Sequence, residues 1–192
     1  MLRWLDEEGS KAGLTINTTK TKVMRSALSS LQPVLLQGGP LEDVSEYVYL
    51  GRLLNMENDI KREIARRGRA GWAAYNSVIS VLEDTKDQKL REDLFNSTVP
   101  PALCYASETW ALTKVAETQL RATQISIERR MLELSLRQQK ERHLHNSDVR
   151  AMSKVHSAVL HADESKHRYA GHLMRCKDGR WRTTRPTSSK VV

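Results

Sequence analysis

The chain has 192 residues, a formal net charge of +8 and a hydrophobic fraction of 39%, which suffices for one modest core or two small ones and excludes wholesale disorder. Its two cysteines form no CxxC pair, which excludes a disulfide scaffold and an all-cysteine zinc site. No apolar run reaches the ~20 residues of a membrane span, so we expect an intracellular protein, nuclear or cytoplasmic, with no membrane partner.

Positive charge is concentrated in the last third of the chain. Residues 1–50 carry 5 basic and 6 acidic groups (net −1), residues 51–120 carry 10 of each (net 0), and residues 121–192 carry 16 basic and 7 acidic groups (net +9). Such a basic segment favours a surface that binds nucleic acid. The alternative is a solvated helical surface that is rich in lysine and arginine.

The first 55 residues predict a helix and a small sheet. Apolar spacing predicts a helix over residues 2–12. Short apolar runs between glycine, proline and acidic residues indicate strands. We expect strands over 21–25, 33–36 and 47–54, with Gly38–Gly39–Pro40 and an acidic connection between the last two.

From Asn58 onward the apolar period becomes 3.6 and predicts helices. The first helix runs to about Leu82, with Ile60, Ile64 and Tyr75 in its apolar arc. The opposite, wet side of this helix carries three arginines, Arg62, Arg66 and Arg69.

Further helices follow along the rest of the chain. One begins at Asp87 and should break or kink at Pro100–Pro101, because two consecutive N–H donors are missing there. A third runs from Pro101 through Trp110, and a fourth begins near Thr113. The polar stretch 136–145 is interpreted as a linker. Asn146 or Ser147 caps a fifth helix, a further helical segment extends through His172, and 183–192 is a frayed tail.

The sequence holds no complete catalytic motif. It has no GxSxG or HExxH segment and no Asp-Asp pair, whereas two-metal phosphoryl transfer needs carboxylates that converge on two ions about 4 Å apart. His167, His172 and Cys176 offer three ligands near one helix face, but a structural zinc site needs four. We therefore predict no metal site.

Two groups of cationic residues are candidate phosphate contacts. Lys20 and Lys22 flank Thr21 and would share one face of a strand, although both can simply be surface lysines. Tyr169 and Trp181 interleave with arginines, a pattern that can stack on unpaired bases while contacting phosphates. The alternative is that both aromatic rings anchor the last helix. The arginines are Arg168, Arg175, Arg180 and Arg182.

Six collinear segments together resemble the C-terminal part of a non-LTR (LINE-type) retrotransposon reverse transcriptase, most like the RTE-type clade. They are GLTINTTKTKVM at 13–24 (motif D), EYVYLGRLL at 46–54 (motif E, the primer grip), EIARRGRAGWAAYNSV at 63–78 (the first thumb helix), LFNSTVPPALCYASETWALTK at 94–114, QISIERRMLELSLR at 124–137 and KHRYAGHLMRCKDGRW at 166–181. The resemblance covers nearly the whole chain.

This resemblance implies an α+β fold that is mainly α. A small antiparallel palm-edge sheet would be followed by a helical thumb bundle and a helical C-terminal extension. The implied divisions are 1–55 (palm remnant), 56–135 (thumb), 136–182 (basic helical segment) and 183–192 (disordered tail).

The resemblance also assigns roles to individual residues. Lys20 would be the motif D lysine, which is thought to help protonate the departing pyrophosphate. Template–primer RNA and DNA would be contacted by Lys22, by the primer-grip turn of Tyr49, Leu50 and Gly51, by Arg62, Arg66 and Arg69, and by Arg168, His172, Arg175, Arg180 and Trp181.

The family's Asp-Asp metal-binding turn lies upstream of motif D and does not occur in this sequence. We therefore expect no cofactor on this chain, although the parent enzyme would use Mg²⁺, and no polymerase activity from this chain alone.

The expected function is residual nucleic-acid binding. The alternative is a degenerate helical remnant that acts as a protein-interaction module or has no function. Its exposed arc of Ile60, Ile64 and Tyr75, or the unpaired edges of its palm strands, would then drive self-association.

Overall fold

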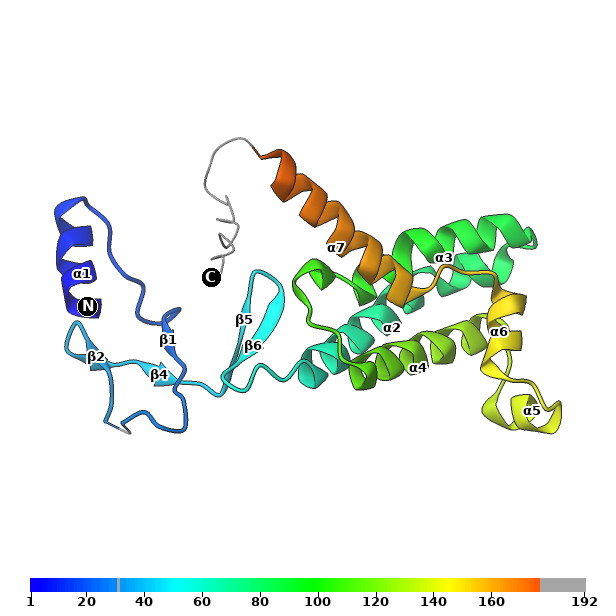
Figure 1. Cartoon of the computed structure of the whole chain (residues 1–192), viewed down its shortest axis with the longest axis horizontal. Helices are drawn as coiled ribbons and strands as arrows, with labels where there is room; N and C mark the ends of the chain where they lie inside the picture. Colours follow the sequence, from blue (N-terminus) through cyan, green and yellow to red (C-terminus); the bar gives the residue numbers. More distant parts are fainter. Residues whose placement is uncertain (31, 177–192) are drawn as a thin grey trace, which may run out of the picture. The chain divides into compact units, whose positions relative to one another are not determined.

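A computed structural model describes residues 1–30 and 32–176. The chain divides into two compact units, Met1–Arg66 and Arg67–Val192, which we call the N-terminal and the helical unit and describe separately. The fold is α+β and mainly α, as predicted (Figure 1). Within the described residues, no helix is both long and apolar enough to cross a membrane.

The described residues of the N-terminal unit form one complete helix and three two-stranded ladders, followed by the first turns of α2 (Lys61–Asp84). The complete helix is α1 (Leu2–Lys11), and the ladders are a parallel pair of β1 (Lys22–Val23) with β4 (Glu42–Asp43), and two antiparallel pairs, β2 (Leu35–Leu36) with β3 (Gly39–Pro40) and β5 (Glu46–Tyr49) with β6 (Arg52–Asn55). Among its described residues outside α2, the buried aliphatic ones are Leu36 and Leu41. The sheet predicted as antiparallel is thus three short ladders, of which one is parallel.

Two strand predictions for this unit were wrong. The single strand expected over 47–54 is a hairpin, because Leu50 and Gly51 adopt positive φ angles of 47° and 81°. Two consecutive residues of this kind form the tight turn whose twist matches a two-stranded hairpin. The connection expected around 38–43 contains β3 and β4.

The helical unit begins within α2. It continues with α3 (Gln88–Leu103), the 3-10 turn η1 (Ser107–Thr109), α4 (Lys114–Met131), α5 (Leu136–Glu141), α6 (Asn146–Ser153) and α7 (Ala158–Arg175). The hydrophobic core joins α2, α3, α4 and the segment after α6. Its buried members are Tyr75, Leu82, Phe95, Val99, Ile127, Met131 and Val155.

The apolar arcs predicted from the 3.6 period are largely confirmed by burial. In α4 and the residues after it, Ala116, Leu120, Ile127, Met131 and Leu134 are all buried. The expectation of an exposed arc on α2 was wrong. Ile64 and Tyr75 are each only 1% exposed, and Ile60 is half-buried. This arc offers no free apolar surface.

Three predictions about helix ends were also wrong. Pro100 and Pro101 do not break α3, which includes both prolines in its last turn and ends at Leu103. No separate helix runs from Pro101 through Trp110, because α3 ends at Leu103, Ala106 adopts a left-handed φ of 62° and only the 3-10 turn η1 follows. The expected linker over 136–145 contains α5, because Ser135 and Gln138 form a reciprocal capping box.

Candidate nucleic-acid interface

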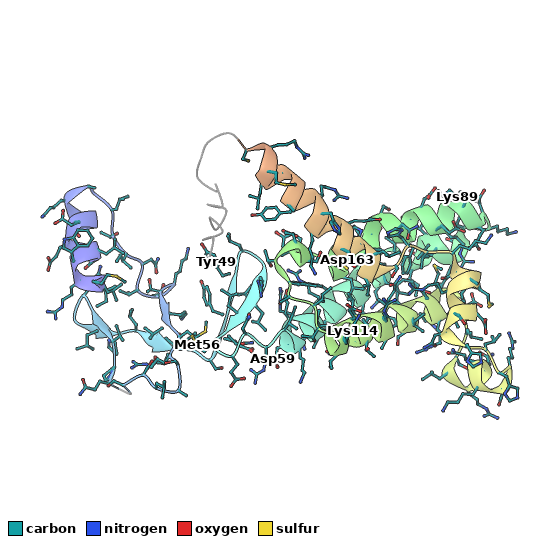
Figure 2. All side chains as sticks on the ribbon, viewed as in Figure 1. Tyr49, Met56, Asp59, Lys89, Lys114 and Asp163 are labelled. Atoms are coloured by element: carbon teal, nitrogen blue, oxygen red, sulfur yellow. The ribbon has the colours of Figure 1, made fainter. Side chains whose placement is uncertain are left out.

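The β5–β6 hairpin presents aromatic and apolar side chains to solvent. Tyr47 is 38% exposed, Tyr49 is 58% exposed and Leu50 at the turn is 79% exposed. Figure 2 labels Tyr49 on this hairpin. The structure thus places the predicted Tyr49, Leu50 and Gly51 together in one exposed turn.

The first turns of α2 hold this hairpin in place. One oxygen of Glu63, Oε2, accepts a hydrogen bond from the backbone N–H of Leu53 at 3.0 Å and another from Arg66 Nε at 2.8 Å. The Arg66 guanidinium also donates to the backbone carbonyl of Gly51. Arg62 donates to Glu46 on β5 at 2.8 Å.

The three predicted arginines of α2 therefore differ in their surroundings. The guanidinium of Arg66 donates hydrogen bonds within the N-terminal unit and stabilises the hairpin. Arg62 is exposed but is paired with Glu46, and this pairing raises its pKa further. Arg69 is exposed and contacts no carboxylate in the part of the chain that is described. Glu63, which sequence reasoning missed, is 1% exposed; an acidic residue three positions before Arg66 was its one signal.

The two candidate lysines do not share one strand face. Lys20 lies in a turn before β1, where its backbone N–H donates to the side chain of Asn17 at 3.0 Å. Lys22 is in β1, and its ammonium pairs with Glu42 on β4. Lys20 is exposed, whereas the charge of Lys22 is already partnered.

A stripe of basic residues lies along α7. At 100° per residue, Arg168, His172 and Arg175 fall within an arc of about 60°, and all three are exposed. Neither arginine contacts a carboxylate in residues 1–30 or 32–176. The buried residues of α7 are Ala158, Val159 and Ala162. Around the helix axis, the centre of their arc lies roughly 120° from the centre of the basic arc. We call Arg168, His172 and Arg175 the α7 stripe.

The last part of α7 leaves the bundle, as Figure 1 shows. Tyr169 is 44% exposed, so the interpretation of Tyr169 as a core anchor was wrong. Arg180 and Trp181, which were predicted to belong to the same surface, lie outside the described residues. Sγ of Cys176 lies 3.7 Å from Nε2 of His172, and the described residues contain no cluster of three or more possible metal ligands.

Buried polar groups attach the start of α7 to the bundle. The Gln124 side chain on α4 donates to the backbone carbonyl of His156 and accepts from the backbone N–H of Ala158, both at 2.7 Å. Asn96 on α3 accepts from the backbone N–H of His156 at 2.8 Å. Sequence reasoning identified neither side chain, because a polar residue within a helix gives no sign of a distant backbone partner.

A second buried polar group attaches α6 to α4. The carboxylate of Glu128, which is fully buried, accepts from Arg150 and from the Ser153 hydroxyl, each at 2.9 Å. Burial raises the pKa of Glu128, while Arg150 and the hydrogen bond from Ser153 oppose that shift. Together, Gln124 and Glu128 fix α6 and the first turn of α7 onto α4.

The two cysteines are expected to differ in their reactivity. Cys104 is buried, its thiol donates to the backbone carbonyl of Ala158, and burial raises its pKa to about 12. Cys176 is exposed. Because the thiolate is the reactive form, a disulfide reagent at about pH 8 should label Cys176 rapidly and Cys104 only after unfolding. Equal labelling rates in the native chain would contradict this assignment.

Comparison with known proteins gives one informative similarity. No family model matches the sequence, and no solved structure matches it. The chain is 44% identical to an uncharacterized transposon-derived protein of Caenorhabditis elegans over 188 residues, which cover 95% of this chain and 67% of that protein.

Proposed function

Because the chain belongs to a family of transposon-derived proteins that includes this nematode relative, we propose that it is part of a non-LTR retrotransposon reverse transcriptase and that it binds RNA and DNA through α7. The six motif-like segments, which occur in the order expected for the C-terminal part of such an enzyme, support the first half of the proposal. The family membership supports a transposon origin.

The observation that carries the binding proposal is the α7 stripe. Its two arginines are exposed and unpaired within the described residues, and they lie on the side of α7 away from the bundle core. Arginine guanidiniums of this kind neutralise backbone phosphates and release counterions, which gives affinity without sequence preference. The stripe also belongs to the third of the chain with a net charge of +9, from 16 basic and 7 acidic groups.

The hairpin supplies a second contact in this proposal. Tyr49 and Leu50 are exposed at its turn, where they would meet a base or a sugar, and Lys20 of the same unit would meet a phosphate. Arg69, in the helical unit, would add a separate phosphate contact. Lys22, Arg62 and Arg66 would contribute less, because they are already paired within the N-terminal unit. With no Asp-Asp pair in its sequence, this chain is proposed to bind nucleic acid in the nucleus or cytoplasm rather than to polymerise it.

A salt series tests the proposal. Fluorescence anisotropy of a labelled RNA–DNA hybrid would be measured with the full chain from about 50 to about 200 mM salt. If about five phosphates are neutralised, log K should fall against log salt with a slope of roughly −4.5. The double variant Arg168→Gln/Arg175→Gln should reduce the magnitude of that slope by about 1.8, because it removes two contacts.

A matched control removes the same charge elsewhere in the helical unit. Arg121 and Arg130 are exposed residues of α4 outside the stripe, and Arg121→Gln/Arg130→Gln should leave the slope within error of the wild-type value. Absence of binding at about 50 mM salt, where phosphate contacts are strongest, would refute the proposal. An equal loss in both double variants would refute the role of the α7 stripe.

A further inference from the structure

The two edges of the β5–β6 hairpin are not equivalent. Its register pairs Tyr49 with Arg52, Val48 with Leu53, Tyr47 with Leu54 and Glu46 with Asn55. In a hairpin with a two-residue turn, the pair beside the turn exchanges hydrogen bonds, and such pairs then alternate with pairs that do not. The backbone groups of Val48 and Glu46 on β5, and those of Leu53 and Asn55 on β6, therefore point away from the ladder.

The outer edge of β6 is already occupied. The N–H of Leu53 donates to Glu63 at 3.0 Å, and the carbonyl of Asn55 accepts from the N–H of Asn58 at 3.2 Å. These bonds confirm that Leu53 and Asn55 face outward.

The outer edge of β5 has no such cover. The outward backbone groups of Glu46 and Val48 have no hydrogen-bond partner among the described residues, and the Val48 side chain is 47% exposed. A strand edge of this kind is a template for another strand. The centre of this edge is also uncharged. Its residues are Tyr47 and Val48, whereas lysine or proline commonly protects an exposed edge.

We propose that β5 pairs with β5 of a second copy of this chain, antiparallel and about a two-fold axis at Tyr47. Each copy then offers the same edge, which is the requirement of a two-fold interface. Glu46 of one copy lies opposite Val48 of the other, and the two residue pairs exchange four backbone hydrogen bonds. The two Tyr47 side chains meet at the axis as a non-hydrogen-bonded pair, the closer of the two pair types.

The alternative register, with Val48 opposite Val48, is worse. It places Glu46 opposite Leu50, whose φ of 47° takes it out of the extended conformation, so the ladder ends after one pair. The hairpin geometry therefore selects the register centred on Tyr47. This inference rests on the N-terminal unit alone and is independent of nucleic-acid binding.

The proposed contact is small, and the association should be weak. Two four-residue strands bury less than the ~1,200 Å² at the lower end of stable interfaces. Dimerisation should thus appear only at high concentration. The test is sedimentation velocity of the full chain from about 5 to about 300 µM, after nucleic acid has been removed by a high-salt wash. The wild-type weight-average mass should rise from 21.9 kDa toward twice that value.

Two substitutions at one position test the register itself. Val48→Glu places a second carboxylate opposite Glu46 in both pairs and should weaken dimerisation by about tenfold. Val48→Lys places an ammonium opposite Glu46, whose carboxylate is already paired with Arg62, and should preserve it. The two variants change the same exposed side chain by the same amount of charge, so their circular dichroism and the protection of Cys104 should match the wild type.

Several outcomes would overturn the proposal. A wild-type chain that stays monomeric over the whole concentration range excludes the contact. Equal weakening by Val48→Glu and Val48→Lys excludes the register centred on Tyr47. Undiminished association of both variants places the interface on another surface.

Discussion

Replacement of Glu128 with alanine is expected to destabilise the helical unit by about 3 kcal/mol. The carboxylate is fully buried and accepts from Arg150 and Ser153. Its removal leaves a cavity and an unpaired guanidinium that is only 27% exposed, and the Ser153 hydroxyl keeps only its weaker acceptor, the carbonyl of Arg150 at 3.1 Å. The denaturant midpoint, followed by the labelling of Cys104, should fall accordingly.

Two further variants separate the charge of Glu128 from its shape. Glu128→Gln keeps the volume and an acceptor oxygen and removes a charge whose burial raises its own pKa; it should cost less than Glu128→Ala, because it leaves no cavity and keeps an acceptor for Arg150. Glu141→Ala, which removes a carboxylate on α5 that is 56% exposed and paired with Arg137, should change stability by less than about 0.5 kcal/mol. A Glu128→Ala variant as stable as Glu141→Ala would show that this buried pair does not hold α6.

The pH dependence of this carboxylate follows from the direction of its shift. Its pKa in the folded chain is raised above the unfolded value, chiefly by burial. Its contribution to stability is therefore fully present below the unfolded pKa, near 4.5, and is lost as pH rises through the folded pKa. Glu128→Gln should accordingly flatten that part of the stability profile.

Replacement of Gln124 with alanine is expected to release the first turn of α7 and to cost about 2 kcal/mol. The Gln124 side chain is 1% exposed and satisfies both the carbonyl of His156 and the N–H of Ala158. Without it, a buried donor and an acceptor lose their partner. Hydrogen exchange of the amides at the start of α7 should accelerate more than that of α4.

The control for this variant is Gln119→Ala, a change on the same helix at a half-buried glutamine whose side chain makes no hydrogen bond within the described residues. It should leave α7 exchange unchanged. If Gln124→Ala also left α7 protected, then Asn96 and the apolar contacts of Ala158 and Val159 would suffice to hold the helix. Because Gln124 is far from solvent, weaker nucleic-acid binding by this variant would report the position of α7 rather than a lost contact.

The sequence predicted the helices best where burial follows a local period. The arc of Ala116, Leu120 and Ile127 on α4 repeats every three or four residues, and that spacing alone places one face against a core. The segment 136–145 lacked such a period and was interpreted as a linker, although Ser135 and Gln138 form the capping box of α5. The capping residues were a local signal for a helix, but the polar composition of the segment favoured the interpretation as a linker.

Other features depend on contacts between residues far apart in the chain, which a periodic pattern does not contain. Arg66 reads as a solvated arginine on the wet side of α2, yet it donates to the carbonyl of Gly51, fifteen positions earlier. Gln124 and Glu128 read as polar positions of α4, yet both are buried because α6 and α7 supply their partners. The three residues of the α7 stripe were named through the family resemblance, although their local spacing also places them on one helical face.

Because α7 is buried only near its start, its outer half is a charged surface that also exchanges between helical and unfolded conformations. No residue of α7 after Ala162 is buried, so 163–175 form a segment of a length at which isolated helices are marginal in water. A partner that binds this segment as a helix must also supply the free energy that orders it. Gly171 offers a way to change that balance without altering charge, since a methyl group there would meet only the flexible guanidinium of Arg175. Gly171→Ala adds helix propensity of up to about 1 kcal/mol, so we expect this variant to bind nucleic acid more tightly than the wild type, with the Arg175 guanidinium displaced slightly by the new methyl group.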